Sequence, residues 1–495
     1  MEIQFHKTVV PYLQTLTHQV QTQEQTQQVR LSDAMPDVGK VLASWGQLLL
    51  RGKEWRSDSC SVSGGVKAWV LYEPEDGSQP RCVESWLPFQ MKWDIPDTDR
   101  DGTVIACPML PLVDARMLSD RKLMVRANIA VEACGMVQSE AALYLPDEVP
   151  ADVQVLKNTY PMLLPAETGE KLFGMEETVS LPSDWQPMDV LLRYTLEPML
   201  TESKLVADKL VFRGNARLRL LYMGTDGRLH SWHTELPFSQ YAQLEQQYEP
   251  SGEVTVCFGV TELELEPGEN GVMMLKVGIA AQYTVYDQKQ ITTVEDMYSP
   301  NRNIKLMFEQ LSVPSVLEFR DQTFRAEASS ENMPAGVTDA LFLPEIPKIQ
   351  MGDDRLDAEL SGAFQMLGLD EDGQWHCDTK SWEDHWSMPV SSDTDVHIHI
   401  LGTDVPQHTG SGVRTELQTQ IMTAMQKPMR VVTGAEMGEM TEPDPNRPSL
   451  ILRRMGEESL WELAKQTGST VEAIQKLNDL QQAPLADQLL LIPIM

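Results

Sequence analysis

The chain has 495 residues, and its 40 Lys and Arg residues against 73 Asp and Glu residues give a net charge of −33. A surface this acidic repels phosphate backbones and anionic lipids, which argues against nucleic acid or a membrane as the main partner. The length predicts about three or four domains. No apolar run is long enough to span a bilayer, and residues 1–7 lack the pattern of an export signal, so we expect a cytoplasmic protein without membrane insertion.

The cysteines are scattered along the chain and form no close pair with metal-ligand spacing. They lie at positions 60, 82, 107, 134, 257 and 377. We therefore expect reduced thiols, with Cys107 and Cys257 as small buried side chains at the ends of apolar strands.

Residues 1–28 are polar and Gln-rich, and we predict only an arm or leading strand there. A first repeat is expected over 29–140. Its central hairpin contains Gly64 and Tyr72, a turn at Asp76-Gly77, and the sequence Leu87-Pro88-Phe89. Asp-Gly between apolar runs is a strong hairpin signal, because both residues tolerate positive φ.

The same markers return in a second repeat over 171–298. Gly214, Tyr222 and Asp226-Gly227 lie 150 positions after their counterparts, and Leu236-Pro237-Phe238 lies 149 positions after its counterpart. A register kept over so many markers indicates two copies of one domain. The segment between the copies, 141–170, is predicted to be a bridge.

A third, diverged repeat is predicted over 304–428, with Gly362 and the turn Asp372-Gly373 as its markers. His397 and His399 share one strand face and could bind a metal ion. A structural role is favoured, because the first two repeats have no histidines there. No motif for phosphate binding, nucleophilic catalysis or zinc occurs, so we predict no enzyme and no cofactor.

Residues 429–448 are predicted to be a Pro-rich linker, because Pro443, Pro445 and Pro448 prevent regular structure. The tail, 449–495, predicts the order β-α-α-β. Ser459 to Lys465 forms the first helix, which ends at Gly468. Ser469 and Glu472 have the spacing of a capping box for the second helix.

The tail resembles a LysM module. The residues that carry the resemblance are Ser459-Leu460-Trp461, Leu463-Ala464-Lys465, Gly468-Ser469-Thr470-Val471, Leu477-Asn478-Asp479-Leu480 and Leu491-Ile492-Pro493. LysM modules bind N-acetylglucosamine glycans through two loops. Here Glu457 and Asp487 replace loop glycines, which suggests a weakened glycan groove and a module adapted to protein contact.

The hairpin markers of the repeats resemble the SPOCS domain of spore-coat proteins. Several such copies followed by a LysM module are typical of the SipL-like family of spore morphogenetic proteins. The resemblance implies a mainly β fold, with three tandem β-sandwich-like repeats followed by a small βααβ module. It also implies a scaffold in the mother-cell cytoplasm, at the forespore surface, that docks onto a SpoIVA-like coat-basement ATPase, with other coat proteins as further candidate partners.

Within this interpretation the LysM loops are the predicted binding site, for the partner or for a glycan. The site residues are Glu457, Glu458, Ser459, Leu460, Trp461, Leu480, Pro484, Leu485 and Asp487. Trp461 has two interpretations: it packs between the short helices, or it anchors a docking patch with Leu460 and Leu485. The alternative function is binding of peptidoglycan or a related glycan at the cell or spore envelope.

Overall fold

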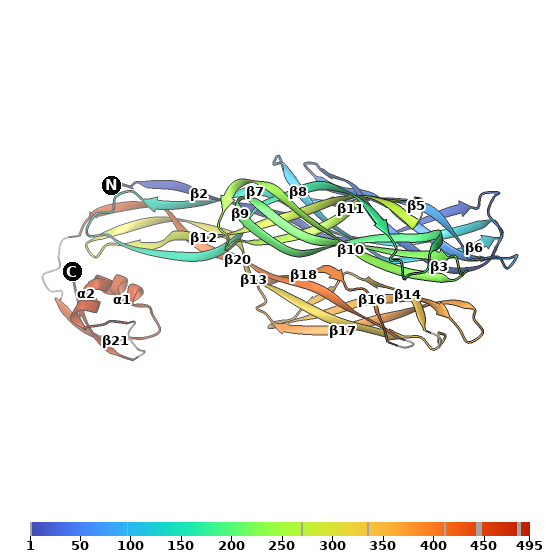
Figure 1. Cartoon of the computed structure of the whole chain (residues 1–495). Helices are drawn as coiled ribbons and strands as arrows, with labels where there is room; N and C mark the ends of the chain where they lie inside the picture. The colour runs from blue at the N-terminus through green and yellow to red at the C-terminus, as the bar shows by residue number, and fades with distance from the viewer. Residues whose placement is uncertain are drawn as a thin grey trace.

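The computed structural model describes residues 2–96, 98–268, 271–333, 336–409, 412–441, 448–482 and 487–495. Nearly all of this chain is β-strand, so the predicted mainly β class is confirmed. Figure 1 shows an elongated body of long strands, with a small helical module beside one end of it. Neither helix of the described part of the chain is long and apolar enough to cross a membrane.

Each repeat is built from two sheets. Repeat 1 contains β2 (Phe5–Arg30), β3 (Val38–Trp55), β4 (Ser59–Pro74), β5 (Arg81–Asp94), β6 (Gly102–Ser119) and β7 (Lys122–Pro146). The order β2-β7-β6 forms one sheet and β3-β4-β5 the other. Val66 and Phe89 from one sheet and Val125 and Ile129 from the other meet in one buried core, which makes the unit a sandwich.

Repeat 2 contains β8 (Gln154–Ser180), β9 (Met188–Gly224), β10 (Leu229–Tyr248), β11 (Glu253–Pro267) and β12 (Val272–Tyr298). Its strand bounds follow the offset of the sequence markers. β12 begins 150 residues after the start of β7. β9 begins 150 residues after the start of β3 and ends 150 residues after the end of β4, so this one strand corresponds to two strands of repeat 1. The order β8-β12-β11 again faces a second sheet, β9-β10.

Repeat 3 contains β13 (Arg302–Ser329), β14 (Val337–Pro344), β15 (Lys348–Met351), β16 (Arg355–Leu369), β17 (Trp375–Pro389), β18 (Thr394–Thr403), β19 (Gln407–Thr409) and β20 (Gly412–Met440). β18 and β19 pair with β20, and β14, β15 and β17 pair with β16. A short strand, β1 (Glu2–Ile3), pairs with β20 at Glu436 and Ala435.

The repeated glycines have a structural reason. A Cβ on Gly64 would lie 2.2 Å from the Leu49 carbonyl oxygen, and one on Gly214 would lie 2.2 Å from the Met199 carbonyl oxygen. In both repeats the phenylalanine of Leu-Pro-Phe fills the remaining space. Only glycine permits this close approach of two strands under an aromatic ring.

The turn glycines are also confirmed. Gly77, Gly227 and Gly373 have φ values of 72°, 75° and 74°. This conformation is open to glycine at little cost and strained for residues with a Cβ. The Asp-Gly signal therefore located the same turn in each repeat.

The first and last strands of each repeat extend beyond the sandwiches and together form a stalk. Its strand pairs are β2 with β7, β8 with β12 and β13 with β20. Tyr12, Leu143, Met162, Ile291 and Val431 share one of its buried clusters, which all three repeats supply. Figure 1 shows this end of the body near the N-terminus and the C-terminal module.

The stalk corrects three predicted boundaries. The segment over 1–28, predicted as an arm or leading strand, contains β1 and most of β2. The bridge over 141–170 contains the end of β7 and the start of β8, and the linker over 429–448 belongs to β20 as far as Met440. Neighbours from other repeats bury the inward-facing side chains of each segment. Residues 442–447 of the predicted linker lie outside the described residues.

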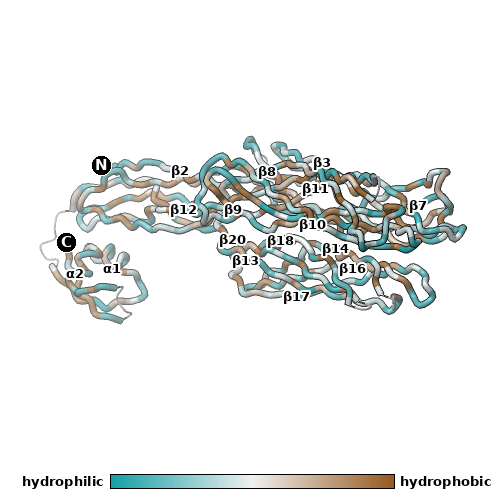
Figure 2. The backbone as a smooth tube through the Cα atoms, in the orientation of Figure 1, coloured by the Kyte–Doolittle hydropathy of each residue, from teal (hydrophilic) through white to brown (hydrophobic). Residues whose placement is uncertain are grey.

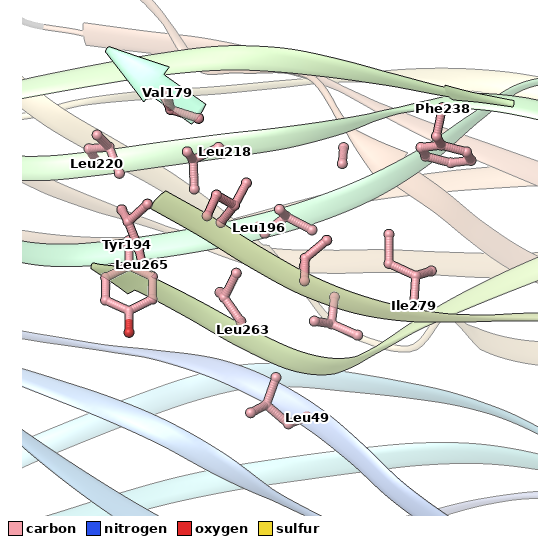
Figure 3. Close-up of a cluster of buried hydrophobic side chains, with 14 of the residues drawn as sticks. Leu49, Val179, Tyr194, Leu196, Leu218, Leu220, Phe238, Leu263, Leu265 and Ile279 are labelled. Atoms are coloured by element: carbon pink, nitrogen blue, oxygen red, sulfur yellow. The ribbon is translucent and has the colours of Figure 1, made fainter. Parts of the chain in front are cut away.

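The repeats do not have separate cores. Leu49 of repeat 1 belongs to one buried cluster with Leu218, Leu263 and Ile279 of repeat 2, and Figure 3 shows it on the side of Leu263. The same cluster takes in Leu341 of repeat 3. Figure 2 shows apolar backbone positions running through the interior of the whole body. The repeats are therefore fused into one unit.

The cysteine prediction is wrong for one pair. Cys107 of β6 and Cys257 of β11 form a disulfide between repeat-equivalent positions, with Cα atoms 6.3 Å apart. The two strands belong to different repeats, and their packing brings the sulfur atoms together. Cys60, Cys82, Cys134 and Cys377 are free thiols.

Candidate docking site in the C-terminal module

The C-terminal module has the predicted order β-α-α-β. It consists of β21 (Leu450–Arg454), α1 (Leu460–Thr467), α2 (Val471–Leu477) and β22 (Leu489–Pro493). The strands pair antiparallel, and Leu463, Ile474, Leu490 and Ile492 form a buried core between the hairpin and the helices. Gly468 ends α1 in the left-handed conformation, as predicted.

The capping box belongs to the other helix. The Ser459 hydroxyl accepts a hydrogen bond from the Glu462 amide, and the Glu462 carboxylate accepts one from the Ser459 amide. At α2 the cap is Thr470, whose hydroxyl accepts from the Ala473 amide. The predicted cap of the second helix, Ser469, is therefore one residue too early in the chain. Its side chain is buried and does not cap α2.

The predicted site residues come together only in part. Backbone hydrogen bonds join Met455 to Asp487 and Gln488, so the loop before α1 meets the loop before β22. Glu457 and Asp487 are exposed there, while Glu458 makes an ion pair of 3.2 Å with Arg453. Leu480 follows α2 and packs against the module core. Pro484 and Leu485 lie outside the described residues.

Asp487 has a φ of 65°, in the left-handed region. The backbone thus keeps the conformation that a glycine would adopt at this position, although the side chain is an aspartate. Asp is among the residues that tolerate this region best. The substitution therefore places a carboxylate on the loop without changing its backbone path.

Trp461 does not pack between the helices. Its ring meets the Tyr298 ring edge to face, with centroids 4.8 Å apart, and its indole Nε1 donates a hydrogen bond of 2.8 Å to the Asp296 carboxylate. Lys465 also donates to Asp296, at 2.7 Å, and the Tyr298 hydroxyl donates to the Ser469 carbonyl. The end of β12 thus forms a seat for α1, defined by Asp296 and Tyr298.

No local pattern in the sequence indicates this seat. Asp296 and Tyr298 lie about 165 residues before Trp461, in a strand with the ordinary alternation of a repeat's closing strand. One face of the predicted docking patch is therefore already occupied by the chain itself.

The opposite face of the module is apolar and exposed. Successive side chains of each strand point to opposite faces of the hairpin, so those that do not face the helices point outward. The outward residues Leu450, Leu452, Leu489 and Leu491 are all exposed, and Leu452 has 63% of its surface accessible. We call these four residues the leucine face. Contiguous exposed leucines of this kind mark protein contact sites more often than ordinary surface.

The body also carries a segment that matches a known family. Residues 187–266, which contain β9, β10 and most of β11, show the turn and glycine geometry described above. They match the family described as SipL, SPOCS domain. No curated protein and no solved structure matches the chain.

The SPOCS match covers the central part of repeat 2 and supports a SipL-like family. It includes Gly214, the Asp226-Gly227 turn and Phe238, which are markers used to recognise the repeats. Cys257 also lies within the matched residues, and its disulfide partner Cys107 lies in repeat 1. The matched segment is thus covalently tied to its neighbour.

His397 and His399, the candidate metal ligands, lie outside the SPOCS segment at a junction between repeats 1 and 3. The His397 ring packs on the His18 ring, with centroids 4.0 Å apart, and Glu132 accepts a hydrogen bond of 2.8 Å from His18. His399 lies 3.5 Å from the same carboxylate. Within the described residues no cluster of His, Cys, Asp or Glu has the arrangement to hold a metal ion.

Burial and hydrogen bonding set the charges of His397 and Glu132 at this junction. Burial, together with the neighbouring His18 and His399, lowers the pKa of His397 to about 3. Burial disfavours ionisation of Glu132, but hydrogen bonds from His18 and His399 outweigh it and lower the pKa of that carboxyl. The folded state therefore keeps His397 neutral beside an ionised Glu132.

Substituting His397 with asparagine is expected to reduce the acid sensitivity of the fold. Below pH about 6.5 an unfolded His397 binds a proton that the folded state rejects, so stability falls as pH drops from there toward 3. The wild type should lose about 1–2 kcal/mol more than His397→Asn between pH 7.5 and 5. Chemical denaturation at both pH values measures this difference. His385→Asn, at an exposed position, is the control, and equal pH dependence of all three proteins would contradict the assignment.

Proposed function

We propose that the chain is a non-enzymatic scaffold of spore-coat assembly. The fused repeats form a long rigid body, and the C-terminal module, a LysM-like unit, docks onto a SpoIVA-like coat-basement ATPase at the forespore surface. The match of residues 187–266 to the SPOCS domain supports a role in sporulation. The tether assignment, the partner and a mother-cell cytoplasmic location are inferences from the resemblance of the whole layout.

The leucine face is the observation that carries the docking proposal. The helical side of the module rests on Asp296 and Tyr298, while the strand side presents four leucines to solvent. Burying an exposed leucine in an interface contributes up to about 1.5–3 kcal/mol, so a few such residues suffice for a specific contact. Arg454, exposed on the same side of β21, lies 3.8 Å from the Asp487 carboxylate, so a charged pair borders the leucine face.

The carboxylates in the two loops favour protein contact over glycan contact. Glu457 is exposed before α1 and Asp487 is exposed before β22, where a sugar would approach the backbone closely. Each acid fills space that a glycine would leave open. Glycan binding is therefore the competing function rather than the preferred one.

Changing Leu452 to glutamate is expected to weaken binding of the coat-basement ATPase at least about tenfold, because a charge would be buried in an apolar contact. Leu172→Glu on β8 is the matched control: Leu172 is 62% exposed, but it lies on the body. Binding of purified full-length proteins by biolayer interferometry measures both, and circular dichroism checks the fold. Undiminished binding of Leu452→Glu would refute the leucine face as the docking surface. Saturable binding of chitin oligomers to the wild type would favour the glycan function instead.

A further inference from the structure

A cavity of about 350 Å³ lies where the three repeats meet. Its walls come from β3 and β6 of repeat 1, β9 and β11 of repeat 2, and β14 and β18 of repeat 3. The volume falls within the range of small-molecule sites, which are concave and mostly apolar with a few polar groups. The cavity is remote in sequence from the C-terminal module, so a ligand site there would be independent of the docking proposal.

The apolar part of the wall is extensive. Leu48, Leu110, Leu200, Val256, Leu341 and Ile400 all line it. Side chains of this kind leave a space that water fills poorly and that a hydrocarbon group fills well.

Two arginines, Arg217 and Arg219, line the same cavity from one face of β9. Arg217 is engaged: it donates to Glu235 at 3.2 Å and to the Thr403 carbonyl, and it lies 3.9 Å from Glu197. Arg219 differs, because its guanidinium donates to the Ala340 carbonyl and makes no ion pair with any described residue. Burial, with repulsion from Arg193 and Arg217, lowers the pKa of Arg219 to about 10, against the opposing effect of Asp339 and Glu197.

Glu132 and Glu197 are the acids of the cavity wall, and among the described residues they contact His399 and Arg217 rather than forming an ion pair with Arg219. Glu197 accepts a hydrogen bond of 3.2 Å from the Thr403 amide, and burial raises the pKa of its carboxyl. The Arg219 side chain is half-buried, and a bound carboxylate would supply an ionic partner with two parallel hydrogen bonds. The Arg217 Nε, which is buried and has no hydrogen-bond partner within the described part of the chain, would also gain from an anion there.

We propose that this cavity binds a small amphipathic carboxylate, with its carboxylate at Arg219 and its hydrocarbon part between Leu110, Val256 and Ile400. Such a ligand satisfies the charge and fills the apolar space at once. Because it contacts all three repeats, it would also hold them in one arrangement. Binding to the folded state alone raises the unfolding temperature as ligand concentration rises.

The test uses the full-length protein and octanoate as the probe. Calorimetry is expected to show saturable binding of octanoate, with much weaker binding of acetate, which lacks the tail, and of 1-octanol, which lacks the charge. Arg219→Gln should weaken octanoate binding at least about tenfold. Arg213→Gln is the control, because Arg213 lies on the same strand but is exposed and paired with Glu202.

A second variant guards against misfolding of Arg219→Gln. Ile400→Phe keeps the charges of the cavity and fills part of its volume. It should therefore also weaken octanoate binding, while acetate should still bind only weakly. Absence of saturable octanoate binding to the wild type, or wild-type affinity in both cavity variants, would overturn the proposal. Equal affinity for octanoate and 1-octanol would overturn the role of Arg219.

Discussion

Replacing Asp339 with alanine is expected to lower the free energy of unfolding by about 3–5 kcal/mol, because it leaves the Arg193 guanidinium buried without its counter-charge. Arg193 of β9 and Asp339 of β14 have 0% and 1% of their side chains exposed, and two hydrogen bonds of 2.7 and 3.2 Å join them. The guanidinium also lies 4.7 Å from the centroid of the Trp45 ring in β3. One ionic group thus connects all three repeats.

Guanidinium chloride unfolding of Asp339→Ala and of a control, Asp357→Ala, checks the expectation. Asp357 pairs with Arg355 at an exposed position, so its loss should leave the unfolding midpoint nearly unchanged. The double variant Arg193→Met, Asp339→Leu should recover most of the stability, because an apolar pair needs no compensation. Ser231, which donates a hydrogen bond of 2.7 Å to Asp339, would still lose its acceptor. A single variant as stable as the control would contradict the burial argument.

Replacing Asp296 with alanine is expected to release the C-terminal module from the body. Asp296 accepts hydrogen bonds from both Trp461 and Lys465, and hydrogen bonds to a charged group contribute about 1.5–3 kcal/mol. Hydrogen–deuterium exchange should therefore accelerate in α1 and at the end of β12, and small-angle scattering should show a larger radius of gyration. Glu295→Ala is the control, since Glu295 bonds Asn158 and Tyr160 rather than the module.

The same variant separates two docking surfaces. If the partner contacts Trp461, releasing α1 from its seat should tighten binding, because the intramolecular contact no longer competes. If the partner contacts the leucine face, affinity should stay unchanged, since those residues are exposed in both arrangements. Unchanged exchange in Asp296→Ala would show that the seat does not hold the module.

The sequence predicted features that depend on local chemistry. The turn at Asp76-Gly77, the close approach at Gly64 and the end of α1 at Gly468 each follow from one residue and its neighbours. Because these requirements recur with the repeat, the fold class could be inferred, but the order of the strands in each sheet could not. The β-α-α-β order of the module could be inferred for the same reason, since its core residues lie close together in the chain, although the capping box was assigned to the wrong helix.

Features that depend on distant partners could not be predicted. Met429 and Val431 looked like part of a linker because prolines follow them, yet Tyr12 and Leu143 bury them in the stalk. The seat of Trp461 and the pairing of Arg193 with Asp339 likewise join segments more than a hundred residues apart. A single sequence contains no local signal for such contacts, since each residue type is ordinary in its own strand.

The position of the module at the end of β20 has a mechanical consequence. β20 lies antiparallel to β13 from Met440 to Gly412, and its hydrogen bonds run across the strand direction. A force that pulls the module away along the strand axis would load this ladder in shear, with many bonds sharing the tension at once. A pull across the sheet would instead open the bonds one after another. The geometry therefore suits an element that bears load along its length.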